Sequence, residues 1–154
     1  MTFLIGKTIR DNILFGEVYN PDQYDEVLNA IGINFDRYNG RDFYQVAERA
    51  INLKSDDRLN ILLARFLYRD SNIYVAEDLF TDVDHGLLET LINRVVKRFL
   101  RGKTLIYVAK HPQLVGLANL IIKFGSRYQY DITRIDKPNV QLEGGMSAGL
   151  ESKP

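Results

Sequence analysis

The chain has 154 residues, of which 45% are hydrophobic and 26% are charged, so it is long enough to bury the core of one domain. Its 20 Lys and Arg residues balance its 20 Asp and Glu residues, and this net charge of zero argues against a nucleic-acid partner. The absence of cysteine excludes disulfides, zinc–thiolate sites and thiol catalysis. No apolar run approaches the roughly 20 residues that span a bilayer, and Lys7 interrupts the apolar start. We therefore expect an intracellular protein without a signal peptide or transmembrane segment.

The first half of the chain is predicted to be helical. Thr8 can cap a short helix through Leu14, and a second helix starts at Asn20-Pro21 and stops at Gly32. A weaker pattern predicts a helix over residues 42–52. A longer helix is predicted from residues 56 and 57 through 67, because carboxylates suit the positive N-terminal end of a helix.

The second half adds strands. Ile73–Ala76 is too short for a helix and predicts a buried parallel strand, and residues 104–109 and 120–124 predict two more, joined by a short helix after Pro112. A helix over residues 86–99 would have one apolar face, formed by Leu87, Leu88, Leu91, Ile92, Val95 and Val96. Residues 128–130 predict either a late strand or an interface patch. The composition of residues 136–154 predicts a flexible tail, which leaves one α/β domain over residues 1–135.

Several short blocks of sequence carry a family resemblance. In chain order they are TFLIGKTIRDNILFG (2–16), ERAINL (48–53), LAR (63–65), IYVAED (73–78), KTLIYVAK (103–110) and ANLII (118–122). Their order and spacing resemble the second half of an ATP-binding cassette (ABC) nucleotide-binding domain. Their residues are most similar to those of the exporters of subfamily C. The resemblance covers most of the chain. It implies part of a P-loop NTPase fold, with a helical subdomain and a short, mostly parallel sheet.

The segment that resembles the family's LSGGQ signature has a different charge. The aligned residues are Leu53, Lys54, Ser55, Asp56 and Asp57. In the family, this loop presents backbone N–H groups and a serine hydroxyl to the γ-phosphate of the opposite subunit. Like charges about 4 Å apart repel by about 4 kcal/mol at an effective dielectric constant of 20, so two carboxylates disfavour a triphosphate. The comparison therefore implies a vestigial signature that binds no nucleotide.

The residues that resemble the Walker B and switch motifs are also altered. Glu77 replaces the magnesium-holding aspartate of Walker B, and Asp78 replaces the catalytic glutamate. Lys110 stands where the switch histidine would be, and His111 is displaced by one residue. A shift by one residue at a strand end turns the side chain elsewhere. We therefore expect no ATPase activity.

Acidic residues gather after the strand that ends in Ala76. Asp82 and Asp84 fall where the D-loop would be, and with Asp78 and His85 they could offer hard ligands to Mg²⁺. Polar residues in such a loop more often form a solvated helix cap. No metal site is therefore predicted.

A phosphate-binding P-loop is not predicted either. Gly6-Lys7-Thr8 matches the end of GxxxxGK[ST], but a P-loop needs a preceding strand, and the helix cap at Thr8 accounts for these residues. In the family, the P-loop strand lies inside the sheet beside the strand that resembles residues 104–109. Without it, we expect unpaired backbone groups that a partner protein covers, unless residues 128–132 fill the gap or the flanking strands close it.

We expect the first of three functions that the sequence allows. The first is a non-catalytic accessory or scaffold subunit without a cofactor, which binds other proteins in the cytoplasm, in an organelle matrix or at the periphery of a membrane complex. The second is the C-terminal fragment of a split ABC ATPase, in which Glu77 and Asp78 complete a site for ATP and Mg²⁺ with a P-loop-bearing partner. The third is an unrelated small α/β binding protein.

Overall fold

The computed structural model describes residues 3–77, 88–89, 91–108, 112–127 and 129–135. The chain forms two compact units, Met1–His111 and Pro112–Pro154, and each is described by itself. In these described ranges, no helix is long and apolar enough to cross a membrane. The predicted flexible tail lies outside them.

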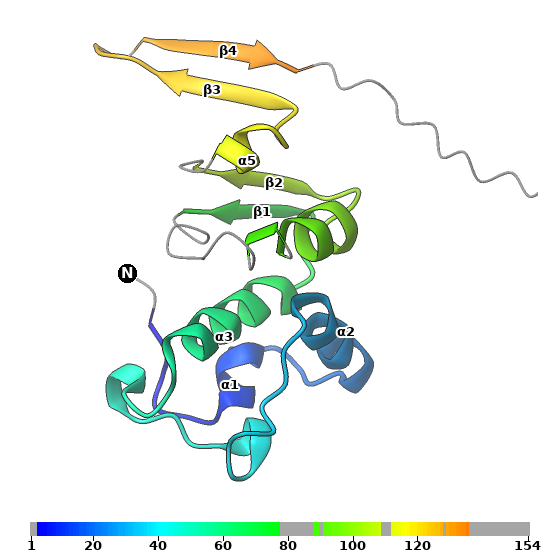
Figure 1. Cartoon of the computed structure of the whole chain (residues 1–154), viewed down its shortest axis with the longest axis vertical. Coiled ribbons are helices and arrows are strands. Elements are labelled where there is room, and N and C mark those ends of the chain that lie inside the picture. Colours follow the sequence, from blue (N-terminus) through cyan, green and yellow to red (C-terminus); the bar gives the residue numbers. More distant parts are fainter. Residues whose placement is uncertain (1–2, 78–87, 90, 109–111, 128, 136–154) are drawn as a thin grey trace, which may run out of the picture. The chain divides into compact units, whose positions relative to one another are not determined.

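Both predicted N-terminal helices are confirmed (Figure 1). Helix α1 (Ile9–Leu14) follows Thr8, whose hydroxyl accepts a hydrogen bond from the backbone N–H of Asp11 at 3.0 Å. Helix α2 (Pro21–Ile31) ends at Gly32, which has a φ of 79°. This left-handed conformation suits glycine, so the start and stop signals in the sequence set the helix boundaries.

The prediction of a helix over residues 42–52 is wrong. The structure has two short 3₁₀ turns there, η1 (Arg41–Phe43) and η2 (Glu48–Ala50). Arg49 and Ala50 adopt φ values of 57° and 54°. A right-handed helix cannot continue through two successive left-handed residues, so the chain turns instead.

Helix α3 (Ser55–Tyr68) is the centre of the helical part, because α1 and α2 both pack against it (Figure 1). The prediction of a helix here is confirmed. The largest fully buried apolar side chains of this part are Ile9, Ile13, Val27, Val46, Ile61, Leu63 and Leu67. They come from all three helices and from the loop before η2.

Strands β1 (Ile73–Ala76) and β2 (Thr104–Tyr107) pair in parallel, as predicted (Figure 1). The prediction that both strands are buried is wrong, because every residue of β2 is exposed or half-buried and β1 is buried on one face only. Tyr74 and Ala76 are buried on one face, whereas Ile73 and Val75 on the other face are 61% and 69% exposed.

The helix predicted over residues 86–99 is partly described. Helix η3 (Ile92–Phe99) has π-helical hydrogen bonding, and the described members of the predicted apolar face are buried except Val96, which is half-buried. The buried residues are Leu88, Leu91, Ile92 and Val95. Leu87 lies outside the described residues.

The second unit contains a short helix and an antiparallel hairpin (Figure 1). Helix α5 (Pro112–Val115) is followed by β3 (Leu120–Phe124) and β4 (Tyr130–Arg134). The strand predicted at 120–124 exists, but its predicted burial is wrong, because every residue of it except Ile121 is exposed. A short connection between two strands permits only antiparallel pairing, so the prediction of a mostly parallel sheet applies to β1 and β2 alone.

Candidate functional site

The signature-like residues lead into the first turn of α3. Leu53 is buried, and Lys54 is the capping residue, with an extended backbone and no side-chain cap hydrogen bond. Ser55 begins the helix and is exposed. The two carboxylates differ, because Asp56 is exposed whereas Asp57 is only 3% exposed.

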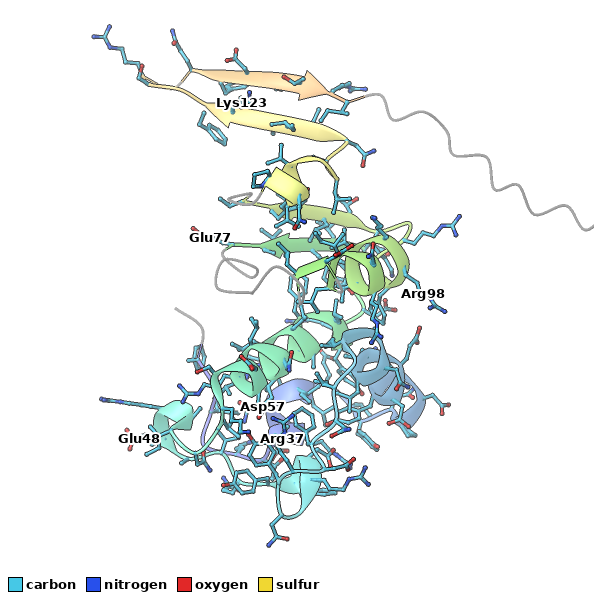
Figure 2. The ribbon with its side chains drawn as sticks, viewed as in Figure 1. Arg37, Glu48, Asp57, Glu77, Arg98 and Lys123 are labelled. Carbon is cyan, nitrogen blue, oxygen red and sulfur yellow. The ribbon has the colours of Figure 1, made fainter. Side chains whose placement is uncertain are left out.

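Asp57 is tied to the loop that precedes η1. The hydroxyl of Tyr38 donates a hydrogen bond to Asp57 Oδ2 at 2.5 Å, and Nη1 of Arg37 lies 3.5 Å from the same oxygen. Burial, together with the hydrogen bond to Asp57, raises the pKa of the Tyr38 phenol. Figure 2 labels Arg37 and Asp57 in the helical part of the fold. The carboxylate at the last signature-like position thus fastens a distant loop to α3.

The segment before α3 is held by its own side chains. Asn52 accepts a hydrogen bond from the backbone N–H of Ala47 at 2.9 Å and donates one to the carbonyl oxygen of Gln45 at 2.8 Å. Arg58 donates through Nη2 to the carbonyl oxygen of Leu53 at 3.0 Å. Glu48 is exposed beside this segment (Figure 2). These bonds fix the approach to the signature-like residues.

The Walker B-like and switch-like residues are described only in part. Glu77 is exposed directly after β1, at the carboxyl end of the parallel pair, as Figure 2 shows. The other predicted positions there, Asp78, Asp82, Asp84, His85, Lys110 and His111, lie outside the described residues. Within the described residues, no three His, Cys, Asp or Glu side chains gather in a way that could hold a metal ion.

Gly6-Lys7-Thr8 is part of a turn that leads into α1. The backbone N–H of Lys7 donates to the carbonyl oxygen of Ile5 at 2.7 Å, and the backbone N–H of Val46 donates to the carbonyl oxygen of Lys7 at 2.9 Å. Thr8 caps α1, as the sequence predicted.

The sequence alone did not reveal the role of Arg65, in the LAR block. Its guanidinium donates to the backbone oxygen of Asn12 at 2.7 Å, to Asn12 Oδ1 at 3.0 Å and to the carbonyl oxygen of Phe3 at 3.1 Å. It also lies 4.2 Å from the centre of the Phe15 ring. Burial lowers the pKa of Arg65. One cation therefore joins α3 to helix α1, to the Phe15 ring that follows it and to the chain segment that precedes it, and only the position of Arg65 in a motif could have pointed to this role.

A small cavity of about 150 Å³ lies beside Arg10, Tyr24 and Asp42. Arg10 is ion-paired with Asp42 at 2.6 Å, and its guanidinium lies 4.5 Å from the centre of the Tyr19 ring. Arg41, which also lines the cavity, is ion-paired with Asp36 at 2.7 Å. Both cations of the lining are thus already paired with carboxylates, and these pairs help to hold this part of the fold together.

Several known proteins are similar to this chain over most of its length. No protein-family model matches it. The putative ABC transporter C family member 15 of Arabidopsis thaliana is 30% identical over 122 residues, which cover 78% of this chain and 12% of that protein. An oligomycin resistance ATP-dependent permease of Saccharomyces cerevisiae is 30% identical over 132 residues, 84% of this chain and 9% of its own length. ATP-binding cassette sub-family C member 2 of Rattus norvegicus is 37% identical over 122 residues, which cover 77% of this chain and 8% of that protein.

The chain is a relative of one segment of the C-family ABC transporters. It spans from 8% to 12% of the length of these three relatives. This relationship accounts for the sequence blocks that resemble ABC motifs. In this ABC subfamily C-like chain, the signature-like turn and the end of β1 are therefore the two places where nucleotide chemistry would be sought.

Proposed function

We propose that this ABC subfamily C-like chain is a non-catalytic module that acts by binding other proteins and does not hydrolyse ATP. One observation carries the proposal. Asp57, at the last position of the signature-like segment, is buried in the first turn of α3 with Tyr38 and Arg37 as its partners.

The charge of this turn opposes a phosphate group. The free N–H groups at a helix N-terminus attract anions, but here the first turn of α3 already carries Asp56 and Asp57. Asp57 cannot swing away without breaking its contacts to Tyr38 and Arg37, and Asp56 stands exposed beside it. A phosphate about 4 Å from one such carboxylate would meet a repulsion of about 4 kcal/mol at an effective dielectric constant of 20.

The rival function is a fragment that completes an ATP site with a second polypeptide. Glu77 supports this alternative, because it is exposed at the carboxyl end of β1, where ligands of open α/β sheets bind. The ATP-dependent activity in the name of the yeast relative belongs to a protein of which this chain covers 9%. The two functions make opposite predictions for nucleotide binding.

Isothermal titration calorimetry of the full chain with ATP, with and without Mg²⁺, tests the proposal. We expect no binding tighter than a Kd of about 1 mM, which corresponds to about −4 kcal/mol. The variant Asp56→Asn removes the exposed charge from this turn and should still bind ATP no more tightly than a Kd of about 1 mM, because the buried carboxylate of Asp57 remains in place. Tight, magnesium-dependent binding of ATP by the unaltered chain would overturn the proposal and favour the rival function.

A further inference from the structure

Helix η3 and the turn after it carry a cluster of positive charge. We call Arg94, Lys97, Arg98 and Arg101 the basic face; all four residues are exposed. Figure 2 shows Arg98 extending outward from the helix. Most apolar residues of the same segment are buried: Leu88, Leu91, Ile92 and Val95 are at most 6% exposed, and only Val96 and Phe99 are half-buried. The segment therefore has one side in the core and a cationic side in solvent.

The basic face has no anionic partner among the described residues. Other cations of the first unit do pair with carboxylates at 4 Å or less, namely Arg10, Arg37, Arg41, Arg69 and Lys103. Among the described residues, Lys97 donates to the neutral Asn93, from Nζ to Oδ1 at 3.0 Å. The chain as a whole has a net charge of zero, so a cluster without a carboxylate partner in the described part of the chain is a local property of one surface.

Arg94 differs from the other three members. Its Nη1 lies so near Gly32 that a Cβ atom added there would clash with it. Gly32 caps the C-terminal end of α2, where the helix dipole is negative and favours a cation. Arg94 is thus anchored at α2, and Lys97, Arg98 and Arg101 remain available to a partner.

The surroundings of the basic face favour an acidic protein segment over a lipid surface or a nucleic acid. Arginine presents a planar fork of donors that matches a carboxylate or a phosphate, and arginine is enriched at protein interfaces. The apolar side chains of helix η3 are buried or, at Val96 and Phe99, half-buried, so the helix exposes no fully accessible apolar side chain that could enter a lipid layer. The aromatic residue of this helix, Phe99, is half-buried, so it offers no fully exposed ring on which a nucleic-acid base could stack.

We propose that the basic face is a docking surface for an acidic segment of a partner protein. This inference rests on the proposed function and adds to it the chemistry of the partner. The three available cations would each meet a carboxylate along an extended or helical stretch rich in Asp and Glu.

Fluorescence anisotropy of a labelled octaglutamate peptide titrated with the full chain tests the proposal. We expect salt-sensitive binding, because exposed charges are screened as the ionic strength rises. The triple variant Lys97→Gln, Arg98→Gln, Arg101→Gln should bind about tenfold more weakly, which is the combined effect of three exposed ion pairs. The matched control removes the same charge from the hairpin unit through Lys123→Gln, Arg127→Gln and Arg134→Gln, and should change the affinity by less than about twofold.

Three results would overturn the proposal. The first is that the unaltered chain does not bind the peptide, and the second is that both triple variants lose the same affinity for it. The third is that the unaltered chain binds phosphatidylserine vesicles more tightly than the peptide, and that only the variant at residues 97, 98 and 101 loses this vesicle binding. The last result would assign the basic face to a lipid surface. Circular dichroism establishes that each variant is folded. Because none of these substitutions touches residues 53–57, failure here is distinguishable from failure of the proposed function, which calorimetry with ATP measures separately.

Discussion

Removing the charge of Asp57 without changing its shape tests whether this carboxylate holds the fold together. In Asp57→Asn, the hydrogen bond from Tyr38 goes to a neutral acceptor, and the ion pair with Arg37 is lost. A hydrogen bond to a charged group contributes about 1.5–3 kcal/mol and one to a neutral group about 1 kcal/mol. The Arg37 side chain is 50% exposed, so its pair with Asp57 adds at most about 1 kcal/mol. We expect the free energy of unfolding to fall by about 2 kcal/mol.

Urea unfolding followed by far-ultraviolet circular dichroism measures this loss. Tyr38→Phe, alone and combined with Asp57→Asn, completes a double-mutant cycle, whose coupling energy should be about 1 kcal/mol. Asp56→Asn removes a charge from the same turn at an exposed position, and should change stability by less than about 0.5 kcal/mol. If Asp57→Asn is as mild as this control, or if the two substitutions are additive, Asp57 does not fasten the loop. The structural basis of the proposed function would then be lost.

Two further predictions concern stability. Arg65→Lys should lower the free energy of unfolding by about 2 kcal/mol in the same urea assay. One ammonium group cannot reproduce the three hydrogen bonds to Asn12 and Phe3 together with the stacking on Phe15. An unchanged midpoint of the urea transition would contradict this role of Arg65. Burial raises the pKa of Tyr24, Tyr74 and Tyr107 above the ordinary value of 10.0, so the folded chain retains protons that the unfolded chain releases. The contribution of these protonated phenols to the free energy of unfolding should therefore be fully present below pH 10 and be lost as the pH rises further. In Tyr24→Phe, the free energy of unfolding should fall less steeply with rising pH. An identical pH dependence in the variant would refute the assignment to Tyr24.

Local signals in the sequence predicted the helices well, because their causes lie within a few residues. The hydroxyl of Thr8, the Asn20-Pro21 pair and the glycine at position 32 act on the backbone beside them, and the structure confirms each boundary. The failure over residues 42–52 has a different origin. The left-handed backbone at Arg49 and Ala50 is unusual for these residue types, and no composition rule foresees it.

Burial was harder to predict than secondary structure. The sequence predicts Asp57 at the N-terminal end of a helix, and the structure confirms this position. Its burial could not be predicted, because its partners Tyr38 and Arg37 lie far from it in the sequence. In the same way, the apolar strand at residues 120–124 was expected to be covered on both faces. Apolar composition shows that a strand can be buried, but only the tertiary structure shows whether another layer covers it.

The solvent-facing side of the β1–β2 pair has a practical consequence. Ile73, Val75, Ile106 and Val108 are each more than half exposed there and form a contiguous strip of branched aliphatic side chains. Water-exposed hydrocarbon next to strand edges promotes aggregation. The polypeptide expressed by itself will therefore tend to precipitate as it is concentrated, and a fusion tag or a dilute preparation is the sensible starting point for its biochemistry.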